Sequence, residues 1–472
     1  MLSGKLIGSV REAISACGLR DGMTVSFHHH LRNGDYVLNM VMRAIAEMGL
    51  RNITVSASSI HEVHREIIPL IERGVITGID TNYISASVGA AISAGQLAAP
   101  VTFRTHGGRP DALSTGQAHI DVAFIAAPAA DCMGNLNGVD GPSACGSLGY
   151  AFADAQAADQ VVVITDHLVP YPLSRVSISE CYVNYVVQVD CIGDAKGIAS
   201  QTTQLTRDPV ALQIAKTAAD VIACSGLLQD GFSVQTGTGG ASLAVTKYLE
   251  DHILRRRIQG SFALGGITGY MVDMLERGLF RELKDVQCFD LRAVESIRSN
   301  PHHQEISARN YASSLSPSCV ASSLDCVILG ATEMDVNFNV NVHTDSNGRI
   351  IGGSGGHSDV AAGAKCSIIV APLYRSRTST VVEQVTCVST PGTDVDVLVT
   401  QRGVAVNPRR PELAQRLKEG GIQVVDIHDL RRLCVDRCGE GRRAVCTDHV
   451  VDRVLSRNNQ LQEHICAVVP GR

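Results

Sequence analysis

The sequence predicts an α/β protein made of two similar units, each an open and mostly parallel sheet covered by helices. Three observations predict this fold class. The chain has 472 residues, more than one hydrophobic core usually supports. Short apolar runs rich in Val, Ile and Ala alternate with helical segments, the pattern of parallel strands that are buried on both faces. One block of sequence also occurs twice.

The repeated block covers residues 121–137 and, without a gap, residues 325–341. Four identical polar residues recur in it at equal offsets, which chance rarely produces. We therefore predict an internal duplication, with a first α/β unit in residues 1–206 and a second in residues 207–472. The four pairs are Asp121 with Asp325, Asp131 with Asp335, Asn135 with Asn339, and Asn137 with Asn341.

The segments that flank the repeated block follow one another in the same order in both halves. Residues 11–27 and 219–235 each predict an amphipathic helix, a Gly-containing turn and an apolar strand. After the block, residues 158–165 and 364–371 each predict a short buried strand. Ligands of open parallel sheets bind beyond the carboxyl ends of the strands, so the loops that follow these strands are the places to look for a site.

Charge and hydropathy exclude several classes of protein. The net charge of −6 argues against nucleic-acid binding, which needs a concentrated excess of Lys and Arg. No window reaches the roughly 20 apolar residues that span a bilayer, and the N-terminal stretch lacks the apolar run of a signal peptide. We therefore expect a cytoplasmic protein that binds neither nucleic acid nor membranes.

The 15 Cys residues are scattered singly, many inside apolar runs, so we expect small buried hydrophobes and no disulfides. One C-terminal cluster invites comparison with a zinc site. Only one side of it has the short spacing that structural zinc sites prefer, and we therefore predict no metal. The cluster consists of Cys434, Cys438, Cys446 and His449.

The two copies of the block differ at a position suited to chemistry. The second copy has Glu333 where the first has Ala129. Glu333 follows the apolar run DCVILGA and precedes an Asn-rich turn, which places it at the carboxyl end of a strand. We predict that Glu333 is catalytic and that Asn339, in the turn, binds substrate; the alternative is an ordinary surface Glu.

Two glycine-rich stretches lie in the second half. QTGTGGAS follows an apolar strand and precedes a helix, so amides around Gly237, Gly239 and Gly240 lie at a helix N-terminus, where anions bind. GGSGGHSD precedes a second helix of small residues. Amides at Gly355 and Gly356 are predicted to stabilise an oxyanion, each donor contributing roughly 3 kcal/mol in acyl transfer.

Basic side chains follow two strands of the first half. His28, His29 and His30, followed by Arg32, come after the strand MTVSF, and Arg104 and His106 come after VTFR. We predict that the three His, Arg104 and His106 contact an anionic substrate. The His triplet has an alternative role as metal ligands, but alternate side chains of an extended chain face opposite ways, so at most two could converge.

Several motifs together resemble the α subunit of citrate lyase, also called citrate:acetyl-acyl-carrier-protein transferase. The resemblance covers roughly residues 11–410 and departs at both ends. It implies the CoA-transferase fold, which is of the NagB/RpiA-like kind. The motifs are SFHHHLRNGDYVLNMVM, RTHGGR, HIDVAF, CGSLGYA, ITDHLVPYP, QTGTGGASLAV, FALGGIT, NFNVNV and GGSGGH.

The resemblance also implies a reaction, partners and cofactors. Citrate would replace acetate on the acetyl thioester of an acyl carrier protein, and acetyl-CoA would serve as well. The implied partners are the lyase β subunit and the acyl-carrier γ subunit, whose phosphoribosyl-dephospho-CoA arm supplies the thiol. We expect no tightly bound cofactor and a homo-oligomer within the citrate lyase complex used in citrate fermentation.

Such an exchange without hydrolysis requires an acyl anhydride. By resemblance, Glu333 matches the nucleophilic Glu of related CoA-transferases, whereas the citrate lyase branch passes the acyl group directly between bound substrates. Glu333 would then orient groups without being acylated. Two other functions stay open: a transferase acting on free CoA thioesters of another short acid, and a ligand sensor without catalysis.

Overall fold

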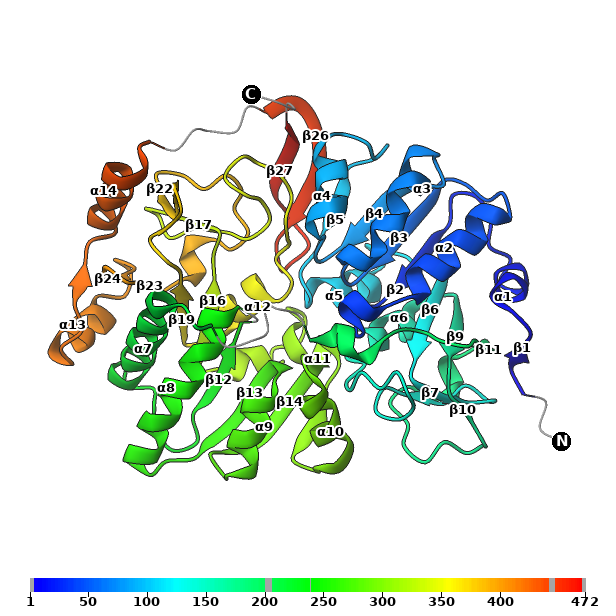
Figure 1. Cartoon of the computed structure of the whole chain (residues 1–472), viewed down its shortest axis with the longest axis horizontal. Coiled ribbons are helices and arrows are strands. Elements are labelled where there is room, and N and C mark those ends of the chain that lie inside the picture. Colours follow the sequence, from blue (N-terminus) through cyan, green and yellow to red (C-terminus); the bar gives the residue numbers. More distant parts are fainter. Residues whose placement is uncertain (1–3, 200–205, 238, 441–445, 469–472) are drawn as a thin grey trace.

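Two large sheets, one from each half of the chain, form the framework of the protein in a computed structural model. The structure describes residues 4–199, 206–237, 239–440 and 446–468. In Figure 1 the first half, in blue and cyan, lies beside the second half, in green to orange. The predicted α/β class with mostly parallel sheets is confirmed.

The first sheet has ten strands, and all neighbours are parallel except the last pair. The residues of its central strand β6, VAFIAA, are all buried, as expected of a strand covered on both faces. The order is β1 (Leu6–Ile7), β11 (Tyr185–Gln188), β9 (Gln160–Thr165), β6 (Val122–Ala127), β2 (Thr24–Phe27), β3 (Ile53–Ala57), β4 (Ile76–Thr81), β5 (Val101–Phe103), β26 (Cys446–Leu455) and β27 (Leu461–Val468).

The second sheet has nine strands, and only the pair β23 and β24 is antiparallel. The two sheets share one strand order. From one side to the other, β11, β9, β6, β2, β3, β4 and β5 of the first sheet correspond to β23, β19, β16, β12, β13, β14 and β15 of the second. The order is β15 (His303–Glu305), β14 (Phe280–Cys288), β13 (Gly260–Ile267), β12 (Ser233–Thr236), β16 (Cys326–Gly330), β19 (Cys366–Val370), β23 (Val397–Thr400), β24 (Gly403–Val406) and β25 (Val424–Val425).

Helices connect the strands. Helix α7 begins at a capped N-terminus, since the Asp208 carboxylate accepts the amides of Val210 and Ala211 and Pro209 takes the first position. The helices are α1 (Val10–Ala16), α2 (Val37–Glu47), α3 (Ile68–Glu72), α4 (Ala86–Ser93), α5 (Gly108–Thr115), α6 (Ala151–Ala157), α7 (Pro209–Cys224), α8 (Gly240–Arg256), α9 (Gly269–Glu276), α10 (Leu291–Ser299), α11 (Ala308–Ala312), α12 (His357–Gly363), α13 (Pro411–Glu419) and α14 (Ile427–Cys438).

The repeated Asp and Asn residues make matching hydrogen bonds in the two halves. Asp121 accepts the amide of Thr24 at 2.7 Å, and Asp325 accepts the amide of Ser233 at 2.8 Å. The other three pairs of repeated residues stabilise two small three-stranded sheets. These are β10 (Leu168–Val169), β7 (Ala129–Asp131) and β8 (Leu136–Asn137), and β18 (Val340–Asn341), β17 (Glu333–Asp335) and β22 (Val381–Val382); a further hairpin joins β20 (Tyr374–Arg375) and β21 (Thr378–Ser379).

The division at residue 206 assigned the C-terminal hairpin to the second unit, but the hairpin packs with the first sheet. Strand β26 pairs in parallel with β5, so β26 and β27 extend the first sheet, where Figure 1 shows them in red next to α4 and β5. Without β26, the last strand of the first sheet would expose an unpaired edge, and the hairpin covers it. Its apolar side chains Val451, Val454, Ile465 and Ala467 are buried.

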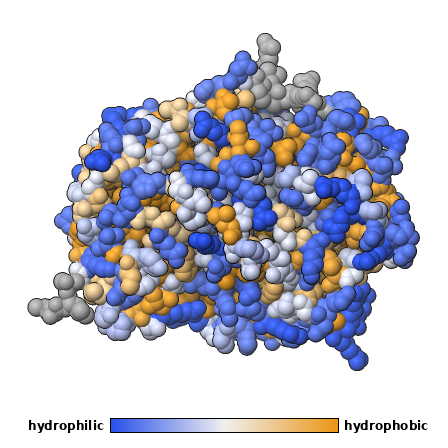
Figure 2. Space-filling model, turned by 180° about the vertical axis from the view of Figure 1, so that it is seen from behind, coloured by the Kyte–Doolittle hydropathy of each residue, from blue (hydrophilic) through white to orange (hydrophobic). Residues whose placement is uncertain are grey.

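The surface carries few large apolar areas on the side shown in Figure 2, where hydrophobic residues occur singly or in small groups among hydrophilic ones. Among the described helices, none is both long enough and apolar enough to cross a bilayer.

Candidate active site

A cavity of about 480 Å³ lies between the two halves, at the carboxyl ends of both sheets. The first half contributes the loops that follow β2, β3, β4 and β5, and the second half contributes those that follow β12, β14 and β16. The glycine-rich segment 352–356, before α12, closes one side. This is the position where open parallel sheets hold their ligands.

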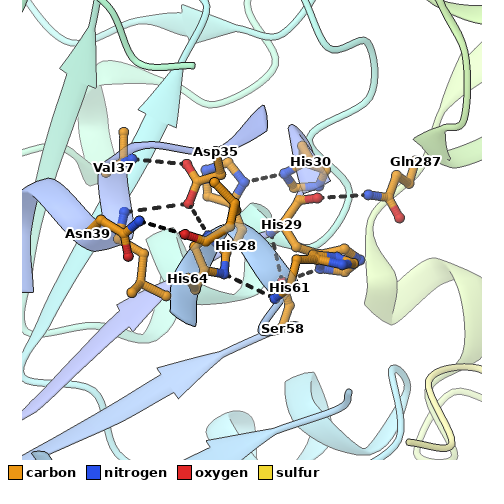
Figure 3. A network of polar contacts seen from close by, with 12 residues as sticks. His28, His29, His30, Asp35, Val37, Asn39, Ser58, His61, His64 and Gln287 are labelled. Carbon is orange, nitrogen blue, oxygen red and sulfur yellow. Dashed lines mark hydrogen bonds and ion pairs between the residues drawn. The ribbon is translucent and has the colours of Figure 1, made fainter. Parts of the chain in front are cut away.

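The His triplet after β2 sends one ring into the cavity. His29 lines it, whereas His28 and His30 face one another through a short contact between their Nδ1 atoms. The amide of Tyr150 donates to His30 Nε2 at 3.2 Å, so the proton of neutral His30 is on Nδ1 and is donated to His28. Gln287 of the second half donates to the carbonyl of His29 at 2.9 Å and links the triplet to β14 (Figure 3).

A second imidazole reaches the cavity from His61, the N-cap residue of the 3-10 helix Glu62–Ile67 that follows β3. The His61 amide donates to His64 Nδ1 at 3.1 Å, and His64 Nε2 lies 2.9 Å from Asp35. Because Nδ1 accepts, neutral His64 carries its proton on Nε2 and donates it to the carboxylate (Figure 3). His61 itself lines the cavity, and its buried Nε2 has no partner within the described part of the chain.

The imidazoles of the cavity are neutral at neutral pH. Burial, with repulsion from His106 and other basic neighbours, holds the pKa of His29 well below its ordinary value, and burial does the same for His61. Burial and the nearby Arg109 lower the pKa of His106 to about 3. These rings therefore offer N–H donors or lone pairs rather than charges.

Arg32 is the one full charge in the cavity lining of the described residues, because no Asp or Glu lines it there. Burial lowers the pKa of Arg32, but a guanidinium keeps its proton in proteins. Its Nη1 is buried and has no partner among the residues that the structure describes. The backbone of Arg32 has a φ of 52°, in the left-handed region that residues other than Gly rarely adopt, and its side chain lines the cavity.

The predicted glycine loops both reach the cavity. Gly237, Gly239, Gly355 and Gly356 line it, whereas Gly240 begins α8 and is not part of the lining. A Cβ added at Gly356 would lie 2.5 Å from Tyr311 Oη, a distance that real Cβ atoms do not show. Gly355 has a φ of 52° and its carbonyl accepts the His106 amide at 2.8 Å.

Comparison with known proteins places this chain in a family. A profile described as citrate lyase, alpha subunit (CitF), matches residues 3–468. The citrate lyase alpha chain of Escherichia coli K12 is 49% identical over 97% of this chain and 90% of its own length. The corresponding chain of Haemophilus influenzae is 47% identical over 98% of this chain and 93% of its own. The chain belongs to the citrate lyase α-subunit family.

Solved structures agree with this assignment. A Streptococcus mutans protein described as a citrate lyase α subunit, crystallised with citrate, has a TM-score of 0.97 and 47% identity, covering 99% of this chain and 92% of its own. The malonate decarboxylase α subunit of Acinetobacter baumannii has a TM-score of 0.69 at 16% identity, covering 93% of this chain and 94% of its own. The second likeness concerns the fold alone.

In this member of the citrate lyase α-subunit family, Arg104 and Asn339 also lie outside the cavity lining, as do His28, His30 and Gly240 among the predicted substrate contacts. Arg104 donates from Nε to Asp80 at 2.8 Å and from Nη1 to Asn459 at 2.7 Å. Asn339 donates to Asp335 at 3.0 Å and accepts the amide of Gly392 at 2.8 Å, which stabilises the turn after β17. Both residues are hydrogen-bonded within the protein, and their contacts with substrate stay predictions.

Glu333 follows β16 at its carboxyl end, as predicted, but its side chain is not part of the cavity lining. The buried carboxylate accepts the side-chain amide of Asn341 at 3.1 Å and the backbone amide of Thr386 at 3.0 Å. These bonds tie β17 to β18 and to the loop after β22. The catalytic role of Glu333 stays a prediction, and the geometry favours a role in holding this small sheet together.

Several polar cavity residues were absent from the sequence-based prediction. Their signals in the sequence were weak: Arg32 was noted beside the His triplet, and Tyr150 lies in the motif CGSLGYA. Burial raises the pKa of both Tyr150 and Tyr311, so their hydroxyls stay protonated and can donate. The polar lining residues that were missed are Arg32, Ser59, His61, Tyr83, Tyr150, Gln235, Thr236, Gln287, Tyr311, Thr332, Ser354 and His357.

In two places, described side chains that could bind a metal ion lie close together. Neither group is part of the cavity lining. Oδ2 of Asp285 accepts from Cys288 and from His303, each at 3.0 Å, in a fully buried cluster. The other group, His119, Asp121 and Asp159, is largely exposed. Of the C-terminal set considered for zinc, Cys434 donates to the Leu373 carbonyl, and the side chain of Cys446 lies outside the described residues.

Proposed function

We propose that this protein exchanges acyl groups between an acetyl thioester and citrate, giving a citryl thioester and acetate. One observation carries the proposal: a cavity between the two halves joins a single cation and neutral imidazoles to two glycine-rich loops, and its described lining has no carboxylate. A cation and N–H donors suit a polycarboxylate, and glycine-loop amides suit the oxyanion of acyl transfer.

The lining without Asp or Glu supports direct exchange between bound substrates. A carboxylate oxygen of citrate attacks the acetyl thioester, which expels the thiolate and forms an acetyl-citryl anhydride. The thiolate then attacks the citryl carbonyl, and acetate leaves with one oxygen from citrate. No protein carboxylate is required, and exclusion of water by the cavity would protect the anhydride.

We also propose that the fold arose by internal duplication. The matching strand order of the two sheets and the equivalent bonds of Asp121 and Asp325 support an internal duplication of the CoA-transferase, NagB/RpiA-like kind. Residues 1–206 and 207–472 would be the two copies, with the C-terminal hairpin added to the first sheet.

Partners follow from family membership. We propose a cytoplasmic citrate lyase complex in which a lyase β subunit and an acyl-carrier γ subunit act with this chain, itself a homo-oligomer. The phosphoribosyl-dephospho-CoA arm of the carrier would supply the thiol, acetyl-CoA would substitute for it, and no cofactor would be held tightly by this chain.

Oxygen transfer tests the proposal. The protein is mixed with acetyl-CoA and citrate labelled with ¹⁸O in its carboxyl groups, and the products of a single turnover are analysed by mass spectrometry. Direct exchange places one ¹⁸O in acetate during that first turnover. Appearance of the first-turnover label in the protein, with unlabelled acetate, would indicate an acylated protein carboxylate, and absence of citryl-CoA would refute the exchange altogether.

A further inference from the structure

Three cavity imidazoles form one continuous group beside Arg32. The ring of His29 lies 5.7 Å from that of His106 and 5.7 Å from that of His61, measured between centroids. Three nitrogens in this group are buried and lack partners within the described residues, namely His61 Nε2, His106 Nδ1 and Arg32 Nη1. Such unsatisfied polar atoms are costly unless a ligand completes them.

The charges of the cavity do not match those of a tricarboxylate. Arg32 supplies one positive charge, and the described lining holds no other full charge. Citrate with three ionised carboxyl groups would leave two negative charges uncompensated in a buried site, which is strongly unfavourable. Among the described lining residues, only imidazoles can gain a positive charge at weakly acidic pH.

We infer that His29, His61 and His106, together with Arg32, form a proton-coupled receptor for a polycarboxylate, in which imidazoles take up protons as the anion binds. The inference rests on the proposed function, because it takes citrate as the ligand. The neutral state of the empty receptor and the charged state of the occupied one have the same cause, the cost of an unbalanced charge among buried groups. An anion within about 4–6 Å raises the pKa of an imidazole by about 1–3 pH units.

The neighbours of the three rings are consistent with this switch. His61 is backed by His64, which is neutral and donates to Asp35, and His106 is near Arg109, whose charge is compensated by Asp154 at 3.0 Å. His357 also lines the cavity, but it is excluded from the receptor because Nδ1 bonds Thr390 and Nε2 bonds the Gly330 carbonyl. The other titratable groups around the rings are His28, His30, Tyr83, Tyr150 and Tyr311.

Calorimetry tests the inference without relying on turnover. Citrate is titrated into the whole protein at about pH 6 and again at about pH 8, each time in two buffers with different ionisation enthalpies. The difference in heat gives the protons taken up, and we expect net uptake at pH 6 that is lost at pH 8, because a rise of about 1–3 pH units leaves the pKa of His106 at or below about 6. Acetate, a monoanion that Arg32 alone can neutralise, is expected to bind with no uptake.

Variants assign the protons. His61→Gln and His106→Gln are each expected to reduce the uptake by half or more, and the exposed His119→Gln, a matched control, is expected to leave it unchanged. As the pH rises, the citrate affinity of the wild type should fall by up to about tenfold per pH unit for each proton taken up. Absence of uptake, uptake that both variants retain, or absence of citrate binding would overturn the receptor. Proton-coupled binding without ¹⁸O transfer would instead overturn the proposed exchange alone.

Discussion

The guanidinium carbon of Arg32, from the first half, lies 4.9 Å from the centroid of the Phe289 ring, from the second half. The aromatic face therefore holds the cation of the cavity in place while its Nη1 stays unpaired. Each half thus supplies one part of the anion site, which neither would form alone.

Phe289→Leu should raise the KM for citrate by about 2- to 30-fold with little change in kcat, because a cation–π contact contributes about 0.5–2 kcal/mol to positioning the guanidinium. Steady-state acetate release with varied citrate measures both constants. Phe262→Leu is the control, since Phe262 lies under Lys284 outside the cavity lining. An equal effect on the KM for the acetyl thioester would contradict a role specific to citrate.

Arg32→Gln and Arg104→Gln should separate the two arginines that follow strands of the first sheet. Loss of Arg32 removes a charge-assisted contact and should weaken citrate binding by roughly 10- to 150-fold. Loss of Arg104 breaks its pair with Asp80 and should lower the free energy of unfolding by on the order of 3 kcal/mol while the KM for citrate stays near its wild-type value. Citrate titrations and denaturant unfolding are the measurements, and the reverse pattern would restore Arg104 as the substrate contact.

Gly356→Ala should reduce transfer by at least about 100-fold, because the new Cβ, 2.5 Å from Tyr311 Oη, must displace the loop or the ring. Tyr311→Phe removes the hydroxyl that clashes. The double variant Gly356→Ala with Tyr311→Phe is therefore expected to be more active than Gly356→Ala alone, a comparison that a double-mutant cycle makes quantitative. Additive losses in kcat/KM would show that the clash is not the cause.

Glu333→Gln should keep kcat within roughly tenfold of the wild type, because a catalytic acid, base or nucleophile contributes at least about 100-fold and the Glu333 side chain is outside the cavity lining. The Gln oxygen can still accept from Asn341 and Thr386, so the melting temperature should change little. A loss of several orders of magnitude in kcat with an unchanged melting temperature would establish the catalytic role instead.

Asp359 predicts a pH dependence of stability. Burial raises the pKa of this carboxyl, which accepts from Thr105 and Gly107 of the other half, to about 7. The folded state then binds a proton that the unfolded state has lost, so stability should fall as pH rises from about 4 to about 7 and level off above that. Denaturant unfolding at several pH values measures this, and Asp359→Asn should flatten the slope. An unchanged slope in the variant would assign the dependence to another group.

The sequence by itself determined the α/β class, the mostly parallel sheets and the family, because these depend on local apolar periodicity and on motifs that are contiguous in the chain. It also located the loops that line the cavity, since the carboxyl ends of parallel strands meet at one edge. His29, His106 and four of the five candidate glycines were found in this way.

The tertiary structure decided which side chains of those loops face the cavity. Arg104 is paired with Asp80 and Asn459, the latter on the C-terminal hairpin that the division at residue 206 assigned to the other unit, whereas Arg32 stays unpaired at Nη1. The local sequence contains neither the pairing of Arg104 nor the free Nη1 of Arg32. The partner of Arg104 lies more than 300 positions away, and the left-handed backbone of Arg32 is a feature of the folded chain. The direction of a side chain and the satisfaction of its hydrogen bonds are properties of the assembled fold.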